Sequence, residues 1–85
     1  MPEVQVGVVK HFFDKISVAA IEMTDGELAV GDTIHFKGHT SDFTTTVDSM
    51  QIEHDQVKKV SKGDMVGIKV AERVREHDAV FKVTE

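Results

Sequence analysis

Apolar side chains recur at every second position over much of the sequence, and this alternation restricts the fold more than any other feature. Val4, Val6 and Val8, for example, are separated by Gln5 and Gly7. Successive side chains of a strand point to opposite faces, so a period of two predicts strands with one buried face. No helical period persists along the chain. The pattern predicts an all-β protein, with strands at 4–13, 16–23, 33–37, 43–53, 66–70 and 79–83.

The fourth of these predicted strands changes phase partway. Phe43 and Val47 share one parity, whereas Met50 and Ile52 have the other. One extra residue at Asp48-Ser49 would bring all four side chains to the same face, so we expect a β-bulge there.

Short strands with phase breaks favour a sheet that closes into a barrel and disfavour a flat sandwich. We therefore expect a single small six-stranded, Greek-key-like β-barrel, and a chain of 85 residues forms one domain, 1–85. The only helix expected is a single turn at Val57–Val60.

Glycine and aspartate mark the expected turns. Glycine permits positive φ or close backbone approach, and aspartate is expected to hydrogen-bond the backbone just after it. Between two of these turns, Leu28 and Val30 are expected to plug one end of the core, and the glycine inside the fifth strand is expected to mark a bend. The residues of these fold-signature turns are Gly26, Gly31, Asp32, Gly38, Gly63, Asp64 and Gly67.

Charge and residue types argue against several classes of function. Fifteen acidic and ten basic residues give a net charge of −5, which disfavours binding along a nucleic-acid backbone, DNA included. The chain has no cysteine, no Gly-x-x-x-x-Gly-Lys-Ser/Thr phosphate loop and no Gly-x-Ser-x-Gly elbow. We therefore expect no enzyme activity, no nucleotide and no cofactor. The lack of a long apolar run or a signal-peptide pattern predicts a cytoplasmic protein without a membrane partner.

Three longer runs carry family resemblances. Gly26–Ile34 resembles the strand–turn–strand signature of domain 2 in elongation factor Tu and related GTPases, and Lys62–Ile68 resembles the glycine-acidic turn and strand of the same family. Gly38–Val47 with Met50-Gln51 is similar to the C-terminal barrel of collagenase-like peptidases. Small free-standing elongation-factor-like proteins look similar over the whole length. The resemblance implies a barrel of the translation-factor domain 2 type without its GTPase.

The sequence departs from the translation-factor pattern at three places. The usual Gly-Arg of the second strand is Ile21-Glu22, an Arg-Gly pair is Ala71-Glu72, and the glycine of the last turn is His77. Acidic groups thus stand where a translation factor would offer basic groups to the end of an aminoacylated RNA. The resemblance therefore supports the fold, whereas the departures from it argue against tRNA binding.

Basic side chains cluster in two turns, and histidines are frequent. Such clusters contact phosphates in single-strand binders, where a phenylalanine stacks on a base. The alternative is two solvated turns and a buried phenylalanine, because acidic residues interleave both clusters. The five histidines also suggest a metal site built from His35, His39 and 53–55. No pair of them has a diagnostic spacing, so we expect no metal site. The candidate binding residues are Lys58, Lys59, Lys62, Arg73, Arg75, His39 and Phe43.

These observations favour a non-catalytic binding module. Its loops at Gly38–Asp42 and Arg73–Asp78 would dock a protein or ribonucleoprotein partner, with translation as one context. The alternative is an accessory barrel for a separate collagenase-like peptidase or RNA-modifying enzyme chain. A monomer or weak homodimer is expected.

Overall fold

The strands form an open sheet in the computed structural model, which describes residues 3–39 and 42–84. An all-β chain is confirmed, but ten strands occur among the described residues instead of six. They are β1 (Glu3–Phe13), β2 (Val18–Met23), β3 (Glu27–Ala29), β4 (Thr33–Lys37), β5 (Asp42–Thr46), β6 (Met50–Ile52), β7 (Asp55–Val57), β8 (Lys59–Ser61), β9 (Met65–Lys69) and β10 (Ala79–Val83).

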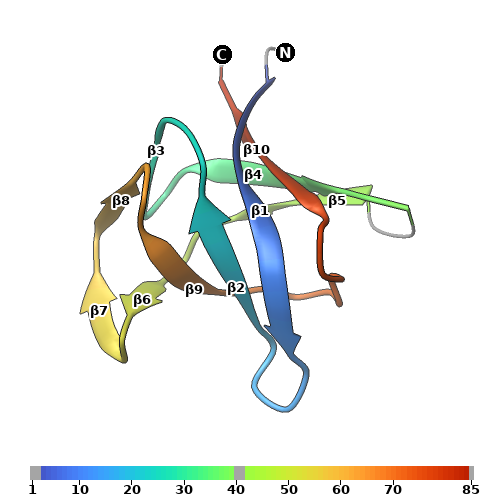
Figure 1. The fold of residues 1–85 in the computed structure, drawn as a ribbon, viewed down its shortest axis with the longest axis horizontal. Coiled ribbons are helices and arrows are strands. Elements are labelled where there is room, and N and C mark those ends of the chain that lie inside the picture. Colours follow the sequence, from blue (N-terminus) through green and yellow to red (C-terminus); the bar gives the residue numbers. More distant parts are fainter. Residues whose placement is uncertain (1–2, 40–41, 85) are drawn as a thin grey trace.

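The predicted closure into a barrel is wrong for the described part of the chain. Eight strands pair in the order β5-β4-β10-β1-β2-β9-β6-β7, and the end strands β5 and β7 are not joined (Figure 1). The segments that follow β2 and β7 pair with each other instead, as the separate two-stranded sheet β3–β8. The sheet therefore keeps two edges.

The alternation of apolar residues places the core as expected. In β2, Ala19, Ile21 and Met23 are buried, and the residues between them are half-buried. β9 repeats this pattern with Val66 and Ile68. Since β2 pairs with β9 in register, these side chains meet in one layer beneath both strands.

The phase change in the fourth predicted strand has a cause other than a bulge. The segment divides into β5 and β6, which lie at different places in the sheet, with residues 47–49 outside any strand. Val47 and Met50 are both buried, so the expected common side is confirmed. Register shifts occur instead in β1, between Gln5 and Gly7 and between Val9 and His11. The helical turn predicted at Val57–Val60 is also wrong, because β7 ends and β8 begins there.

One turn geometry occurs three times. In each copy the fourth residue is an aspartate whose backbone N–H donates to the carbonyl of the first residue, and whose Oδ2 accepts the first residue's N–H. The first donation spans 3.0 to 3.2 Å and the second 2.9 to 3.0 Å. The third residue has positive φ in every copy. The aspartate thus binds backbone three residues before it, not after it as predicted. The copies are Ala29–Asp32, Ser61–Asp64 and Arg75–Asp78.

Leu28 and Val30 do not share the role predicted for them. Leu28 is buried opposite Val60 in the β3–β8 pair, where it closes one end of the core. Val30 occupies the second position of the first aspartate turn, and 45% of its surface is exposed. The plug is therefore Leu28 with Val60.

The two chain ends lie together, far from the β1–β2 turn. β1 and β10 are antiparallel, and Glu3 pairs with Val83. The turn at 14–17 projects from the opposite end of the molecule (Figure 1). In the described ranges, we find no helix of the length and hydrophobicity needed to cross a membrane.

Candidate binding surface around the β1–β2 turn

The lysines of the first predicted cluster do not converge on one cavity. Lys59 pairs with Glu27 across β3–β8, with Nζ 3.1 Å from Oε2. Lys62 is exposed in the turn before β9, and Lys58 lines a cavity of about 730 Å³ together with Asp48. Binding by this cluster stays a prediction.

The remaining two predicted residues outside the arginine loop have different surroundings. Phe43 stacks on Phe36 with ring centroids 5.2 Å apart, so its neighbour covers one ring face. His39 is exposed after β4. It belongs to the predicted docking loop Gly38–Asp42, in which Thr40 and Ser41 lie outside the described residues.

The loop that carries Arg73 and Arg75 is fixed against the β1–β2 hairpin. At its start, the Val70 N–H donates to the Ser17 carbonyl at 2.9 Å. At its end, the His77 N–H donates to the Val9 carbonyl at 2.7 Å. Val74, which stands between the two arginines in the sequence, is buried, and this anchors the segment. The side chains of Arg73 and Arg75 are exposed on either side of it. Within the loop, the Arg75 N–H donates to Oδ2 of Asp78, which is the side-chain hydrogen bond of the third aspartate turn.

Three neighbouring cavities follow this loop and the hairpin as one continuous surface. The first, about 460 Å³, includes Arg73 and Arg75 and shares His11 and Phe12 with the second. The second shares Phe13 and Ile16 with the third, of about 300 Å³. We call this surface the hairpin face. Its basic half contains His11, Phe12, Arg73 and Arg75, and its apolar half contains Phe13, Ile16, Val18, Ala20, Met65 and Gly67.

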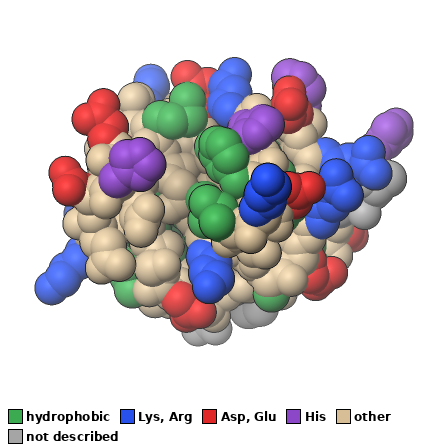
Figure 2. Space-filling model, turned by 90° about the horizontal axis from the view of Figure 1, so that it is seen from below, with side chains coloured by type: hydrophobic (Ala, Val, Ile, Leu, Met, Phe, Trp, Pro, Cys, Tyr) green, Lys and Arg blue, Asp and Glu red, His purple; other side chains and the backbone are tan. Residues whose placement is uncertain are grey.

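Figure 2 views the molecule from the end that carries the β1–β2 turn. Hydrophobic side chains gather near the middle of this end, and basic, acidic and histidine side chains surround them. Three of the five large apolar side chains that are exposed among the described residues, Phe13, Ile16 and Met65, line the apolar half. A contiguous apolar patch with a polar rim is typical of a binding surface.

Sequence reasoning found the arginines of this surface but missed its apolar half. The available signal was the pair Phe13 and Ile16 on either side of Asp14-Lys15, where a hairpin turn is ordinarily polar throughout. The signal for Met65 was strand alternation, because Met65 has the opposite parity to Val66 and Ile68, which face the core.

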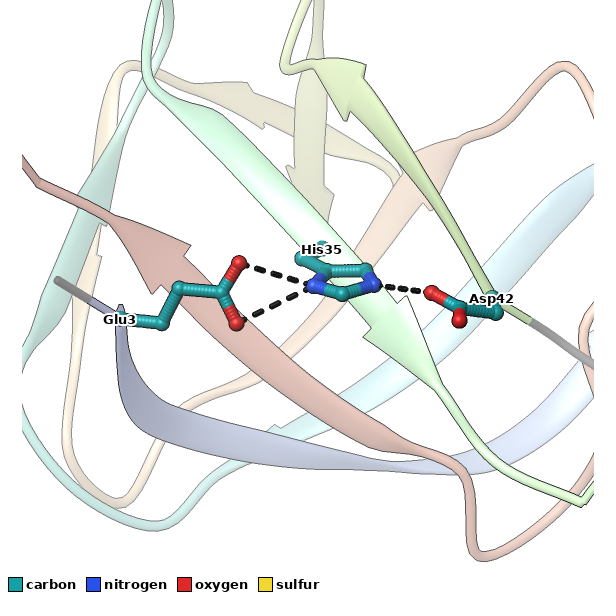
Figure 3. Close-up of polar contacts among 3 residues, drawn as sticks. All are labelled: Glu3, His35 and Asp42. Carbon is teal, nitrogen blue, oxygen red and sulfur yellow. Dashed lines mark hydrogen bonds and ion pairs between the residues drawn. The ribbon is translucent and has the colours of Figure 1, made fainter. Parts of the chain in front are cut away.

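A polar arrangement apart from the hairpin face is centred on β4. The ring of His35 on β4 lies between two carboxylates, with Nδ1 2.9 Å from Glu3 Oε2 and Nε2 against Asp42 Oδ1 (Figure 3). Hydrogen bonding to Asp42, and next to Glu3, raises the pKa of His35 above its ordinary value. Both nitrogens donate only in the imidazolium form. The arrangement therefore ties β1 to β4 and β5.

None of the histidines contributes to a recognisable metal centre within 3–39 and 42–84. No three histidine, aspartate or glutamate side chains of these residues are placed to hold an ion. The carboxylates of Glu3 and Asp42 already occupy both ring nitrogens of His35.

Comparison with known proteins identifies relatives among peptidases. The chain is 40% identical over 84 residues to an uncharacterized protease of Methanocaldococcus jannaschii, an alignment that covers 98% of this chain and 20% of that protein. It is 32% identical over 81 residues to a collagenase of Porphyromonas gingivalis, covering 94% and 20%. The chain thus spans about a fifth of the length of these curated relatives. No family model matches it.

The fold has counterparts among solved structures. It superposes with a TM-score of 0.87 on the C-terminal domain of a Geobacillus thermoleovorans protein assigned to the U32 peptidases. Sequence identity is 17%, and the superposition covers 94% of this chain and 92% of that domain. A selenomethionine variant of the same domain gives a TM-score of 0.85 at 16% identity, covering 91% and 96%. The fold is therefore that of a U32 peptidase C-terminal domain.

These findings separate the two resemblances that the sequence suggested. The similarity to the C-terminal part of collagenase-like peptidases is confirmed. The similarity to domain 2 of elongation factor Tu is not supported, because the relatives and structures found are peptidase-like. The glycine-aspartate turns that suggested it make the fold and identify no function.

Proposed function

We propose that this chain is a non-catalytic accessory domain that holds polypeptide substrates for a peptidase-type catalytic part. The observation that carries the proposal is that the structural match covers nearly all of this chain and nearly all of the other domain. It covers 94% of this chain and 92% of a U32 peptidase C-terminal domain. The relatives carry the names protease and collagenase over chains about five times longer.

The surroundings of His35 support a role in binding and not in catalysis. A histidine that activates a nucleophile needs one ring nitrogen for the nucleophile and the other for an orienting group. His35 has carboxylates at both nitrogens, so it has no position left for a nucleophile. The hairpin face offers apolar and cationic contacts, which are the groups that bind a polypeptide.

The same observations favour the accessory role over docking to a ribonucleoprotein. The ribonucleoprotein hypothesis depended on the likeness to a translation factor and on the two basic clusters. The likeness has no support from the comparisons, and Lys59 of the first cluster forms an ion pair with Glu27. Docking to a protein remains part of the proposal.

The test uses the purified 85-residue chain with two unfolded proteins, denatured collagen and reduced lactalbumin. Biolayer interferometry measures binding, and gel electrophoresis after overnight incubation measures cleavage. We expect saturable binding to at least one protein and no cleavage of either. Cleavage by the chain alone would contradict the non-catalytic role, and failure to bind either protein would contradict the substrate-holding role.

A further inference from the structure

The apolar half of the hairpin face is shaped as a shallow trough. Ile16 is 61% exposed, and Met65 and Phe13 are 49% and 46% exposed around the cavity of about 300 Å³. The trough floor is made of small residues, Ala20 and Gly67, which pair across β2 and β9. A Cβ at Gly67 would lie 3.2 Å from Cγ1 of Val18, so glycine lets that floor stay low. A trough of this kind accepts an aliphatic or aromatic side chain.

The basic half supplies two cations that have no acidic partner among residues 3–39 and 42–84. Lys10 and Lys82 form ion pairs with Glu22 and Asp32. The side chains of Arg73 and Arg75, by contrast, have no ion-pair or hydrogen-bond partner anywhere in the described chain. Their loop is anchored at both ends, so its backbone fixes where the two arginine side chains leave the surface. Guanidinium groups bind carboxylates with two parallel hydrogen bonds.

We propose that the hairpin face binds an extended polypeptide segment in which apolar residues are flanked by acidic ones. An apolar side chain of the segment occupies the trough at Ile16 and Met65, and its carboxylates contact Arg73 and Arg75. This inference rests on the proposed substrate-holding role and adds the chemistry of the segment. The chain ends lie at the far end of the molecule, so attachment to a longer chain there leaves the hairpin face accessible (Figure 1).

A polypeptide explains the surface better than a nucleic acid does. The chain carries a net charge of −5, and Asp14, Glu53 and Glu76 line the same three cavities. These carboxylates repel a continuous phosphate backbone. Phe13 alone among the exposed large apolar side chains of the described residues offers an aromatic plane, whereas single-strand binders stack successive bases on several such planes. An acidic peptide places its charges intermittently, which allows it to meet the arginines and avoid the carboxylates.

The test measures fluorescence anisotropy with three labelled decapeptides of identical length. Leucine alternates with aspartate in the first, leucine with lysine in the second, and serine with aspartate in the third. We expect the first to bind about tenfold or more tightly than either of the others, because each loses one of the two contact types. A labelled single-stranded RNA of ten nucleotides serves as a fourth probe.

Variants locate the site. Ile16→Ser and the double change Arg73→Ala/Arg75→Ala should each weaken binding of the leucine-aspartate peptide about tenfold, as for central anchors of an interface. Only the arginine variant should also remove the salt dependence of binding. Val30→Ser and Lys37→Ala are the matched controls, since Val30 and Lys37 are exposed outside the hairpin face, and both should bind as the parent does. Circular dichroism confirms folding of every variant.

The outcomes separate this inference from the proposed function. If denatured collagen or lactalbumin binds equally to the parent and to the Ile16 and Arg73/Arg75 variants, the hairpin face is not the site, although the substrate-holding role stands. A preference for the lysine peptide or the RNA would overturn the stated ligand chemistry. If no unfolded protein and no peptide binds, both the inference and the proposed function fail.

Discussion

Nδ1 of His35 lies 2.9 Å from Oε2 of Glu3, although the two residues belong to strands that are not neighbours in the sheet. β10 lies between them, and Phe81 of that strand pairs with His35. The Glu3 side chain therefore reaches over β10, while Asp42 approaches the other ring nitrogen from β5. This bridge joins the first strand of the chain to the β5 edge of the sheet.

The bridge makes stability depend on pH in a defined direction. The folded-state pKa of His35 is raised, so its contribution is complete below the unfolded value of about 6.5 and is lost as pH rises through the folded value. His35→Gln should lower the free energy of unfolding by about 0.5–1 kcal/mol at pH ~5.5, a small amount because solvent screens the exposed Asp42 carboxylate. The difference should shrink at pH ~9, as measured by urea denaturation of both proteins.

His11→Gln provides the control, because His11 is exposed and its Nδ1 lies 3.8 Å from the nearest Glu76 oxygen. This variant should differ little from the parent at either pH. A His35→Gln difference of equal size at acidic and alkaline pH would show that the bridge does not depend on the imidazolium form.

The turns could be predicted from sequence where glycine or aspartate indicates the backbone conformation. Gly31-Asp32 and Gly63-Asp64 were predictable because glycine and aspartate favour positive φ and local hydrogen bonding. The third copy was predicted only as a loop, since His77 occupies its positive-φ position. The translation-factor pattern has glycine at this place, and the positive φ of His77 explains why glycine would suit it.

The bridge and the hairpin face could not be predicted in the same way. His35 is 32 residues from Glu3, and they meet only because β10 returns between β1 and β4. Likewise, backbone hydrogen bonds from Val70 and His77 place the arginine loop beside the hairpin. Every residue carries these backbone groups, so no side-chain pattern indicates which of them will pair.

Gly38 should tolerate no side chain, because Asp78 occupies the space beside it. A Cβ at Gly38 would lie 1.9 Å from Oδ1 of Asp78, whose carboxylate is buried. Gly38→Ala should therefore lower the free energy of unfolding by about 1–3 kcal/mol, as overpacking does elsewhere. The same change should cost less in an Asp78→Ala background, because the clashing atoms are gone. Equal losses in the two backgrounds would place the conflict elsewhere.

His77→Gly should stabilise the protein. His77 has a φ of 75°, a conformation that a side chain disfavours and glycine adopts freely. We expect a gain of about 0.5–1 kcal/mol in the free energy of unfolding, and a loss with the β-branched His77→Val. His39→Gly is the control, because His39 is exposed and has no positive φ, and it should show no gain. A similar gain at both positions would mean that relief of backbone conformation is not the cause.

Leu28 and Val30 test whether a sequence motif or burial decides which side chain closes the core. Leu28 is 1% exposed and faces Val60, so Leu28→Ala removes buried contacts and should lower the free energy of unfolding by about 2–5 kcal/mol. Val30→Ala should change it by about 0.5 kcal/mol or less, since the Val30 side chain lies mostly in solvent. Urea denaturation of both variants measures the two values under identical conditions. A decrease in the free energy of unfolding at Val30 comparable to that at Leu28 would support the core-closing role that the motif suggested for both residues. It would also require the Val30 side chain to be covered in the folded protein.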